Sequence, residues 1–159
     1  MPTGLRPAYP DADRPTVFEE GLEFQDFVAD LLLKELGISL TNYASQKYQW
    51  SVGENKQGIE IKLDKRILDT SNVSFEVAEK SQVSMKSWTP SGIMRNDNAW
   101  LYIQGNSQIV FIFGKATLRL VYEKRYSDKV WTPRPTIRTF LMPVVEARKL
   151  ALKVFDLTP

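Results

Sequence analysis

The 159-residue chain contains neither cysteine nor histidine. Without cysteine, disulfide bridges and thiol nucleophiles are excluded. Without histidine, a serine–histidine–aspartate triad is excluded, and the two absences together remove the nitrogen and sulfur ligands of zinc sites. Any bound metal must therefore be a hard ion held by oxygen, such as Mg²⁺, Mn²⁺ or Ca²⁺. Any general acid or base must be Asp, Glu, Lys or Tyr.

Long apolar runs are also missing: none could cross a bilayer, and no signal peptide opens the chain. These absences predict a cytoplasmic protein without a membrane partner. A net charge of +2 neither requires nor opposes a polyanionic partner. The content of 43% hydrophobic and 25% charged residues is typical of a globular domain. Because residues 1–16 contain four prolines and little to bury, we expect a flexible arm over 1–16 and one domain over 17–159.

The clearest periodic segment predicts a helix over residues 16–37, with Phe24, Val28 and Leu31 at helical spacing and Gly37 at its end. Gln25 falls within the apolar arc of this helix. It is either a hydrogen-bonded core residue or a polar group at the rim of a site.

Further along the chain, alternation and turn residues predict strands over 41–53, 59–66, 72–81, 99–105, 109–114 and 136–143. A long loop with a short helical turn is expected over 82–98, and helices over 115–126 and 144–155. Strands flanked by helices in this order predict an α/β (α+β) fold with one mixed β-sheet.

The strand over 59–66 follows Gly58, and its apolar residues alternate with Glu60, Lys62 and Asp64. One interpretation is that the charged side meets water, as in a half-buried strand. The other is that Glu60 and Lys62 point into a catalytic site.

A helix carrying G-x-x-F, a turn into E-x-K on a strand, and a next strand ending in "EKS" together resemble the PD-(D/E)XK nuclease superfamily. This superfamily includes restriction-type endonucleases, Holliday-junction resolvases and phage nucleases. The resemblance spans residues 18–113. It implies a restriction-endonuclease-like fold and a Mg²⁺- or Mn²⁺-dependent DNA endonuclease, with structured or branched DNA as a substrate and a homodimer as one arrangement.

The resemblance also implies roles for residues of this chain. Glu60, Glu54 and the carbonyl of Ile61 would bind the metal ion. Lys62 would orient or deprotonate the attacking water, or stabilise the developing charge. A second E-x-K at residues 54–56 lies in a glycine-bounded turn, where such side chains are usually hydrated.

Two features depart from the family pattern. The upstream aspartate of the family's name is missing, which leaves Glu54 as the nearest acid before Glu60. Several members carry a helix glutamate where this chain has Gln25, so Gln25 would hold the metal or its water through an amide. Glu20 or Glu23 could take that place.

Polar and aromatic residues after the third expected strand are candidates for DNA contacts, namely Lys80, Gln82, Lys86, Trp88 and Arg95. They would touch the phosphate backbone or, for Trp88, stack on an unpaired base. Trp88 could equally cap the core, and the charged residues could simply be hydrated.

Three functions therefore remain open. The leading one is the metal-dependent DNA endonuclease. A second is the same fold with a decayed site that binds DNA or a protein, which the missing aspartate and Gln25 favour. A third is an unrelated interaction protein whose E-x-K strand is merely amphipathic. The positions of Glu60, Lys62, Gln25 and Glu54 in a structure discriminate among them.

Overall fold

The computed structural model describes residues 17–40 and 57–157. The expected arm over 1–16 and the expected strand over 41–53 lie outside these ranges, as does Glu54.

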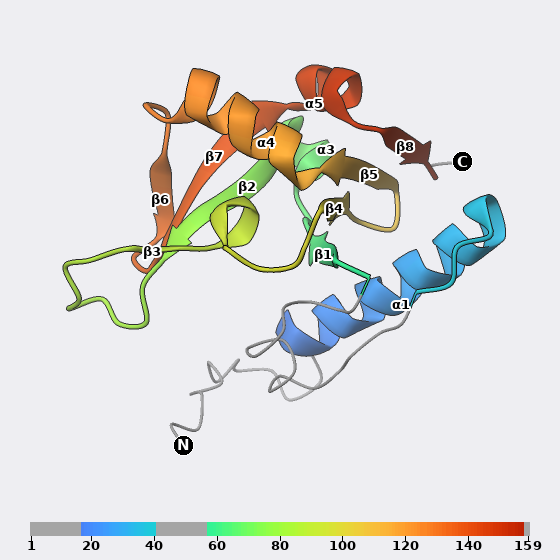
Figure 1. Ribbon diagram of the computed structural model, residues 1–159, viewed down its shortest axis with the longest axis horizontal. Coiled ribbons are helices and arrows are strands. Elements are labelled where there is room, and N and C mark those ends of the chain that lie inside the picture. Colours follow the sequence, from blue (N-terminus) through green and yellow to red (C-terminus); the bar gives the residue numbers. More distant parts are fainter. Residues whose placement is uncertain (1–16, 41–56, 158–159) are drawn as a thin grey trace.

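The described strands form two four-stranded sheets (Figure 1). Sheet A has the order β1-β4-β5-β8, in which β1 is parallel to β4 and the other neighbours are antiparallel. Sheet B has the order β3-β2-β7-β6 and is antiparallel throughout. The strands are β1 Ile59–Leu63, β2 Asn72–Glu79, β3 Thr89–Pro90, β4 Leu101–Gly105, β5 Ile109–Gly114, β6 Trp131–Arg134, β7 Ile137–Pro143 and β8 Lys153–Asp156.

The helices of the described residues are α1 Val17–Leu36, α3 Ile67–Thr70, α4 Lys115–Val121 and α5 Val144–Leu150. A 3₁₀ turn, η1, covers Gly92–Met94, and a π-helical turn, η2, continues α4 over Tyr122–Tyr126. Within residues 17–40 and 57–157, no helix has the length and apolar character needed to span a bilayer. The fold is thus a mixture of α and β elements.

Helix α1 forms because its apolar residues repeat at helical spacing and find a sheet to cover. Phe24, Val28 and Leu31 are buried against sheet A. The helix ends before Gly37, whose φ of +65° suits glycine and whose N–H donates to the Leu33 carbonyl at 3.1 Å.

Sheet A separates two hydrophobic cores. On one face, Ile59 and Ile61 of β1 pack with the apolar side of α1. On the other face, Tyr102 and Phe113 pack with sheet B and the helices that follow it. In Figure 1, α1 and α4 accordingly lie on opposite sides of β1, β4 and β5. Because strand residues alternate between faces, Glu60 points away from α1.

The structure confirms the helices α1 and α4, the strands β1, β2 and β7, and the β4–β5 pair, whose second strand is buried on both faces from Ile109 to Phe113. Two predictions are wrong. The described strands form two sheets rather than one mixed sheet. The helix expected over 144–155 ends at Leu150, because Lys153–Asp156 instead pairs with β5 and buries Phe155 in the α1 core.

Candidate functional site

Strand β1 presents a buried acid and a partly exposed lysine on the same face. The side chain of Glu60 is 0% exposed, whereas that of Lys62 is 35% exposed. Lys62 Nζ lies 3.3 Å from Glu60 Oε1. The expectation that this face simply meets water is therefore wrong for Glu60. A carboxylate is almost never fully buried unless it is paired.

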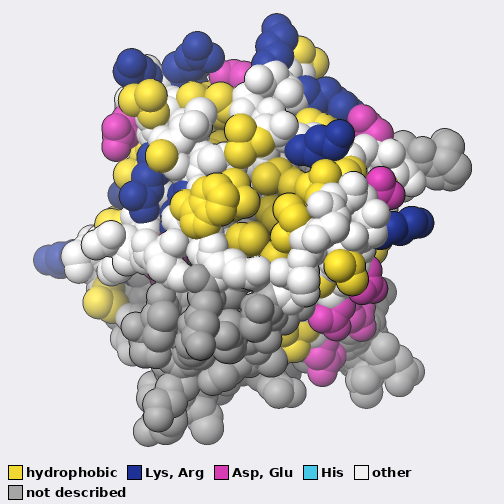
Figure 2. All heavy atoms as spheres, turned by 45° about the vertical axis from the view of Figure 1, so that its right-hand side comes forward, with side chains coloured by type: hydrophobic (Ala, Val, Ile, Leu, Met, Phe, Trp, Pro, Cys, Tyr) yellow, Lys and Arg dark blue, Asp and Glu magenta, His cyan; other side chains and the backbone are white. Residues whose placement is uncertain are grey.

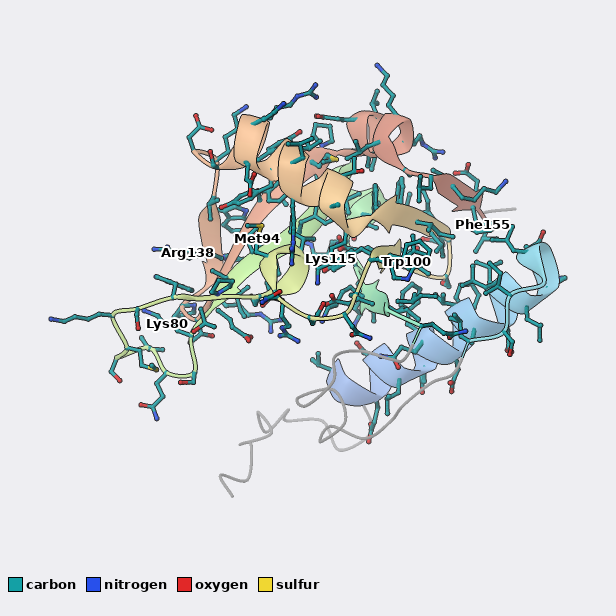
Figure 3. The ribbon with its side chains drawn as sticks, in the orientation of Figure 1. Lys80, Met94, Trp100, Lys115, Arg138 and Phe155 are labelled. Atoms are coloured by element: carbon teal, nitrogen blue, oxygen red, sulfur yellow. The ribbon has the colours of Figure 1, made fainter. Side chains whose placement is uncertain are left out.

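A second lysine reaches Glu60 from the start of α4. The side chain of Lys115, labelled in Figure 3, is only 2% exposed. Its Nζ lies 3.4 Å from Glu60 Oε2 and 2.8 Å from Asp97 Oδ1. The same Nζ donates to the Arg95 carbonyl at 3.1 Å. We call Glu60, Lys62, Asp97 and Lys115 the Glu60 cluster. It holds two carboxylates and two ammonium groups, so its buried charges compensate one another.

Two carboxylate oxygens of the Glu60 cluster have no hydrogen bond within the described part of the chain. They are Glu60 Oε1 and Asp97 Oδ2, and both are buried. Buried polar atoms normally find a partner, so these two oxygens are candidates to bind a water or an ion, although Glu60 Oε1 also lies 3.3 Å from the Lys62 ammonium. Hard ions such as Mg²⁺ are often held by one or two carboxylates, with waters and substrate phosphates completing the shell.

These oxygens fit only part of a metal site. Across residues 17–40 and 57–157, no group of three acidic side chains comes together in a way that could hold an ion. Further ligands would have to come from water, from a phosphate, or from Glu54, which lies outside the described residues. Ile61 sits between Glu60 and Lys62, with its side chain in the α1 core.

Glu76 on β2 adds a third carboxyl group near Lys62. Burial raises the pKa of Glu76 above its ordinary value of 4.5, although the positive charge of Lys62 opposes the rise. Turn η1 lies directly against this residue: a Cβ on Gly92 would come within 2.2 Å of the Glu76 carbonyl oxygen. The positive φ of Gly92, +53°, and this close approach both require glycine there.

The raised pKa makes the effect of Glu76 on stability depend on pH. The folded state holds this proton more tightly than the unfolded chain, so the free energy of unfolding falls as pH rises from about 4.5 through the folded pKa. We expect Glu76→Gln to remove this loss, making the variant at least as stable as wild type at pH 7. The difference should shrink toward pH 4. Urea denaturation across that range measures it.

Glu123→Gln provides the control, because Glu123 is an exposed acid on η2. It should leave the pH dependence unchanged. A Glu76→Gln variant that is less stable than wild type at pH 7, with the gap narrowing on acidification, would contradict the assignment of a buried, proton-retaining carboxyl.

Asp64, the third charged residue of the β1 alternation, has a structural role. Its Oδ2 accepts hydrogen bonds from the Ser74 N–H at 2.9 Å and from Gln104 Nε2 at 3.0 Å. Gln104 Nε2 also donates to the Ser74 carbonyl at 2.5 Å. Asp64 thus ties the end of β1 to β2, which joins sheet A to sheet B beside the cluster.

The predicted acidic site residues of α1, Glu20 and Glu23, do not join the Glu60 cluster. The apolar face of α1 packs on the Ile59 side of β1, which is the side opposite the Glu60 carboxylate. Glu20 pairs instead with Lys65 at 2.7 Å, and Glu23 is exposed on the helix surface. Glu20 and Glu23 are therefore not brought to Glu60, and a role of Gln25 at the site stays a prediction.

The candidate DNA-contacting residues fall into two groups. Lys80 lies 4.7 Å from the ring centroid of Trp88, whereas Gln82 and Lys86 are exposed in the loop between β2 and β3. Arg95 lies nearer the cluster, since its side chain pairs with Glu79 and its carbonyl accepts from Lys115. A contact of any of them with DNA stays a prediction.

Three residues at this site, Lys115, Asp97 and Glu76, were not predicted from the sequence. Lys115 carried a weak signal, because it directly follows the buried run of β5 and begins a helix. Asp97 lies in an irregular segment without periodicity.

A cavity of about 360 Å³ opens beside the Glu60 cluster, lined in part by Trp100, Lys115 and Arg119.

Comparison with known proteins adds no relative. No protein-family model matches the chain, and neither a curated protein nor a solved structure gives a significant match. The function of the chain is therefore inferred from the Glu60 cluster and from the sequence resemblance.

Proposed function

We propose that this protein is a metal-dependent DNA endonuclease in which Glu60 binds the ion and Lys62 acts at the attacking water. The observation that carries the proposal is the pairing on β1: a fully buried carboxylate whose Oε1 accepts no hydrogen bond within the described residues and lies 3.3 Å from the ammonium of a partly exposed lysine. Burying an acid costs desolvation free energy, and proteins often retain such groups at functional sites. The resemblance to PD-(D/E)XK nucleases supports the same two residues.

Each residue of the Glu60 cluster has a separate task in this proposal. Glu60 Oε1 would bind the ion, which supplies charge neutralisation and a more acidic water when bound. Lys62 would orient that water or stabilise the charge that develops on the phosphate. Lys115 and Asp97 are positioning residues, because the Lys115 contacts fix the Glu60 carboxylate from its other oxygen.

A second candidate is a binding module of decayed activity. Lys62 and Lys115 together already balance the charges of Glu60 and Asp97, and no three-acid group forms among the described residues. A cluster of this kind could serve only to fasten α4 and the segment after η1 onto β1. The module would bind DNA or a protein and leave the phosphodiester intact.

Metal dependence separates the two candidates. We expect the purified protein to cut at least one of four DNA forms, duplex, single-stranded, branched or flapped, with Mg²⁺ or Mn²⁺. Excess chelator should abolish cutting, because cleavage depends on the bound ion. A chain without histidine and cysteine can hold that ion only through oxygen ligands. Ca²⁺ should support binding with little cleavage. Gel analysis of end-labelled DNA measures all of these.

Failure to cut any of the four forms with either ion would leave the binding module as the function. Cleavage that persists in excess chelator would contradict the oxygen-ligand site. A mock purification from cells without the gene controls for host nucleases.

A further inference from the structure

A second cavity, of about 440 Å³, opens at one end of sheet B. This volume lies within the range of about 300–1,000 Å³ typical of small-molecule sites. Its lining comes from β2, β3, β6 and β7 together with η1 and η2, and is mainly aromatic and aliphatic. The chief members are Trp88, Met94, Tyr122, Val130, Trp131 and Arg138.

Trp131 offers an aromatic surface at this cavity. It is 48% exposed, although it is one of the largest apolar side chains in the protein. It lies on β6, the edge strand of sheet B, whose residues are all exposed. Within the described part of the chain, no cation and no other ring stacks on it. An exposed ring over a cavity is suited to stack on a flat partner.

The charges at this cavity are positive. Arg138 is its one charged lining residue within the described ranges, and its Cζ lies 4.2 Å from the ring centroid of Trp88. Lys80 lies near the same ring, and Figure 3 shows Lys80, Arg138 and Met94 on the same side of the molecule. The face turned forward in Figure 2 lies away from this cavity; on that face Lys and Arg are most numerous in the upper half, and Asp and Glu gather at the lower right. An anionic ligand with a flat apolar part fits the cavity's lining.

We propose that this cavity binds an unpaired nucleotide of a nucleic-acid strand, with the base stacked on Trp131 and the phosphate held by Arg138 and Lys80. This inference rests on the proposed function and deepens it by naming unpaired strands as the ligand class. Turn η1 connects the two places, since Met94 lines the cavity and the carbonyl of Arg95 accepts from Lys115 in the Glu60 cluster. A strand held here lies one short turn from the proposed catalytic residues.

Binding of a short fluorescein-labelled oligothymidylate, in excess chelator so that no cleavage occurs, tests the proposal. Trp131→Ala should weaken binding about five- to hundredfold, the range expected for the loss of one stacked base. Trp131→Phe should retain most of the affinity, because a ring remains. Arg138→Gln should also weaken binding and should reduce the slope of log affinity against log salt by about one. Lys149→Gln, on exposed α5, is the charge-matched control and should bind as wild type.

Unchanged affinity of folded Trp131→Ala, with folding checked by thermal melting, would overturn the proposal. The proposal would also be overturned if the protein failed to bind the oligothymidylate and instead bound a proline-rich peptide at Trp131. The result is separable from the proposed function. DNA cleavage without a Trp131 effect on binding removes only this inference, whereas Trp131-dependent binding without any cleavage removes only the enzyme.

Discussion

Replacing Lys115 with methionine is expected to lower the free energy of unfolding by about 3–5 kcal/mol, the range for removing one partner of a buried ion pair. Methionine keeps much of the length and the apolar stem of lysine, so packing changes little. In wild type the Lys115 ammonium lies 3.4 Å from Glu60 Oε2 and 2.8 Å from Asp97 Oδ1. The loss arises because both carboxylates stay buried when this ammonium is removed. Urea denaturation at pH 7 measures the change.

Lys149→Met is the matched control for this experiment, because Lys149 is exposed on α5. It should alter stability by no more than about 0.5 kcal/mol. Equal stability of Lys115→Met and Lys149→Met would show that the Lys115 contacts do not hold the Glu60 cluster together.

Lys62→Ala is expected to reduce the rate of DNA cleavage by about 10²–10⁴-fold, the usual contribution of a positioned group at the reacting water. DNA affinity should change little, because one lysine is a small part of a footprint of several phosphates. Single-turnover cleavage with Mg²⁺ and binding in Ca²⁺ give the two values. Lys62 is partly exposed, so the variant should fold.

Lys65→Ala controls for the loss of a positive charge near β1. Lys65 pairs with Glu20 at 2.7 Å on the exposed side of α1, a contact worth at most about 1 kcal/mol. It should cut DNA as wild type does. Equal losses of cleavage in Lys62→Ala and Lys65→Ala would point to weakened DNA binding rather than to a role in chemistry.

The elements that sequence predicted well are those with one regular apolar face. Helix α1 and strand β2 each repeat buried residues at the period of their own structure, and β5 is apolar throughout. Strand β6 escaped prediction because Trp131–Arg134 is entirely exposed and contains Pro133. The helix predicted to run to residue 155 was too long because pairing of β8 with β5 overrides local helix propensity.

Only part of the candidate site could be predicted from the sequence. Glu60 and Lys62 stood out because alternation on β1 puts them on one face. Lys115, the second lysine that pairs with Glu60, lies 55 positions after Glu60, and no local pattern links the two residues. The role of Asp64 at the strand end was equally hidden, since it depends on the contact with Gln104 on β4.

One expectation about stability also changes with the structure. From alternation alone, a charged residue on the polar side of a strand contributes little to the core, so Glu60→Ala and Glu60→Gln should both fold normally. The structure shows Glu60 fully buried and paired with Lys115. Truncation to alanine would leave Lys115 with Asp97 as its one remaining carboxylate within the described residues. Glutamine preserves the shape and is therefore the better probe of chemistry.

The most direct test is the cleavage rate of Glu60→Gln, measured in Mg²⁺ on a sample whose folded fraction is determined by circular dichroism. If Glu60 binds the metal ion, the variant should be folded at the assay temperature, bind DNA in Ca²⁺, and cut at least about 10²-fold more slowly than wild type. Cleavage by folded Glu60→Gln at the wild-type rate would contradict the assignment of Glu60 as the metal ligand. A rate that falls only in proportion to the unfolded fraction would contradict it equally.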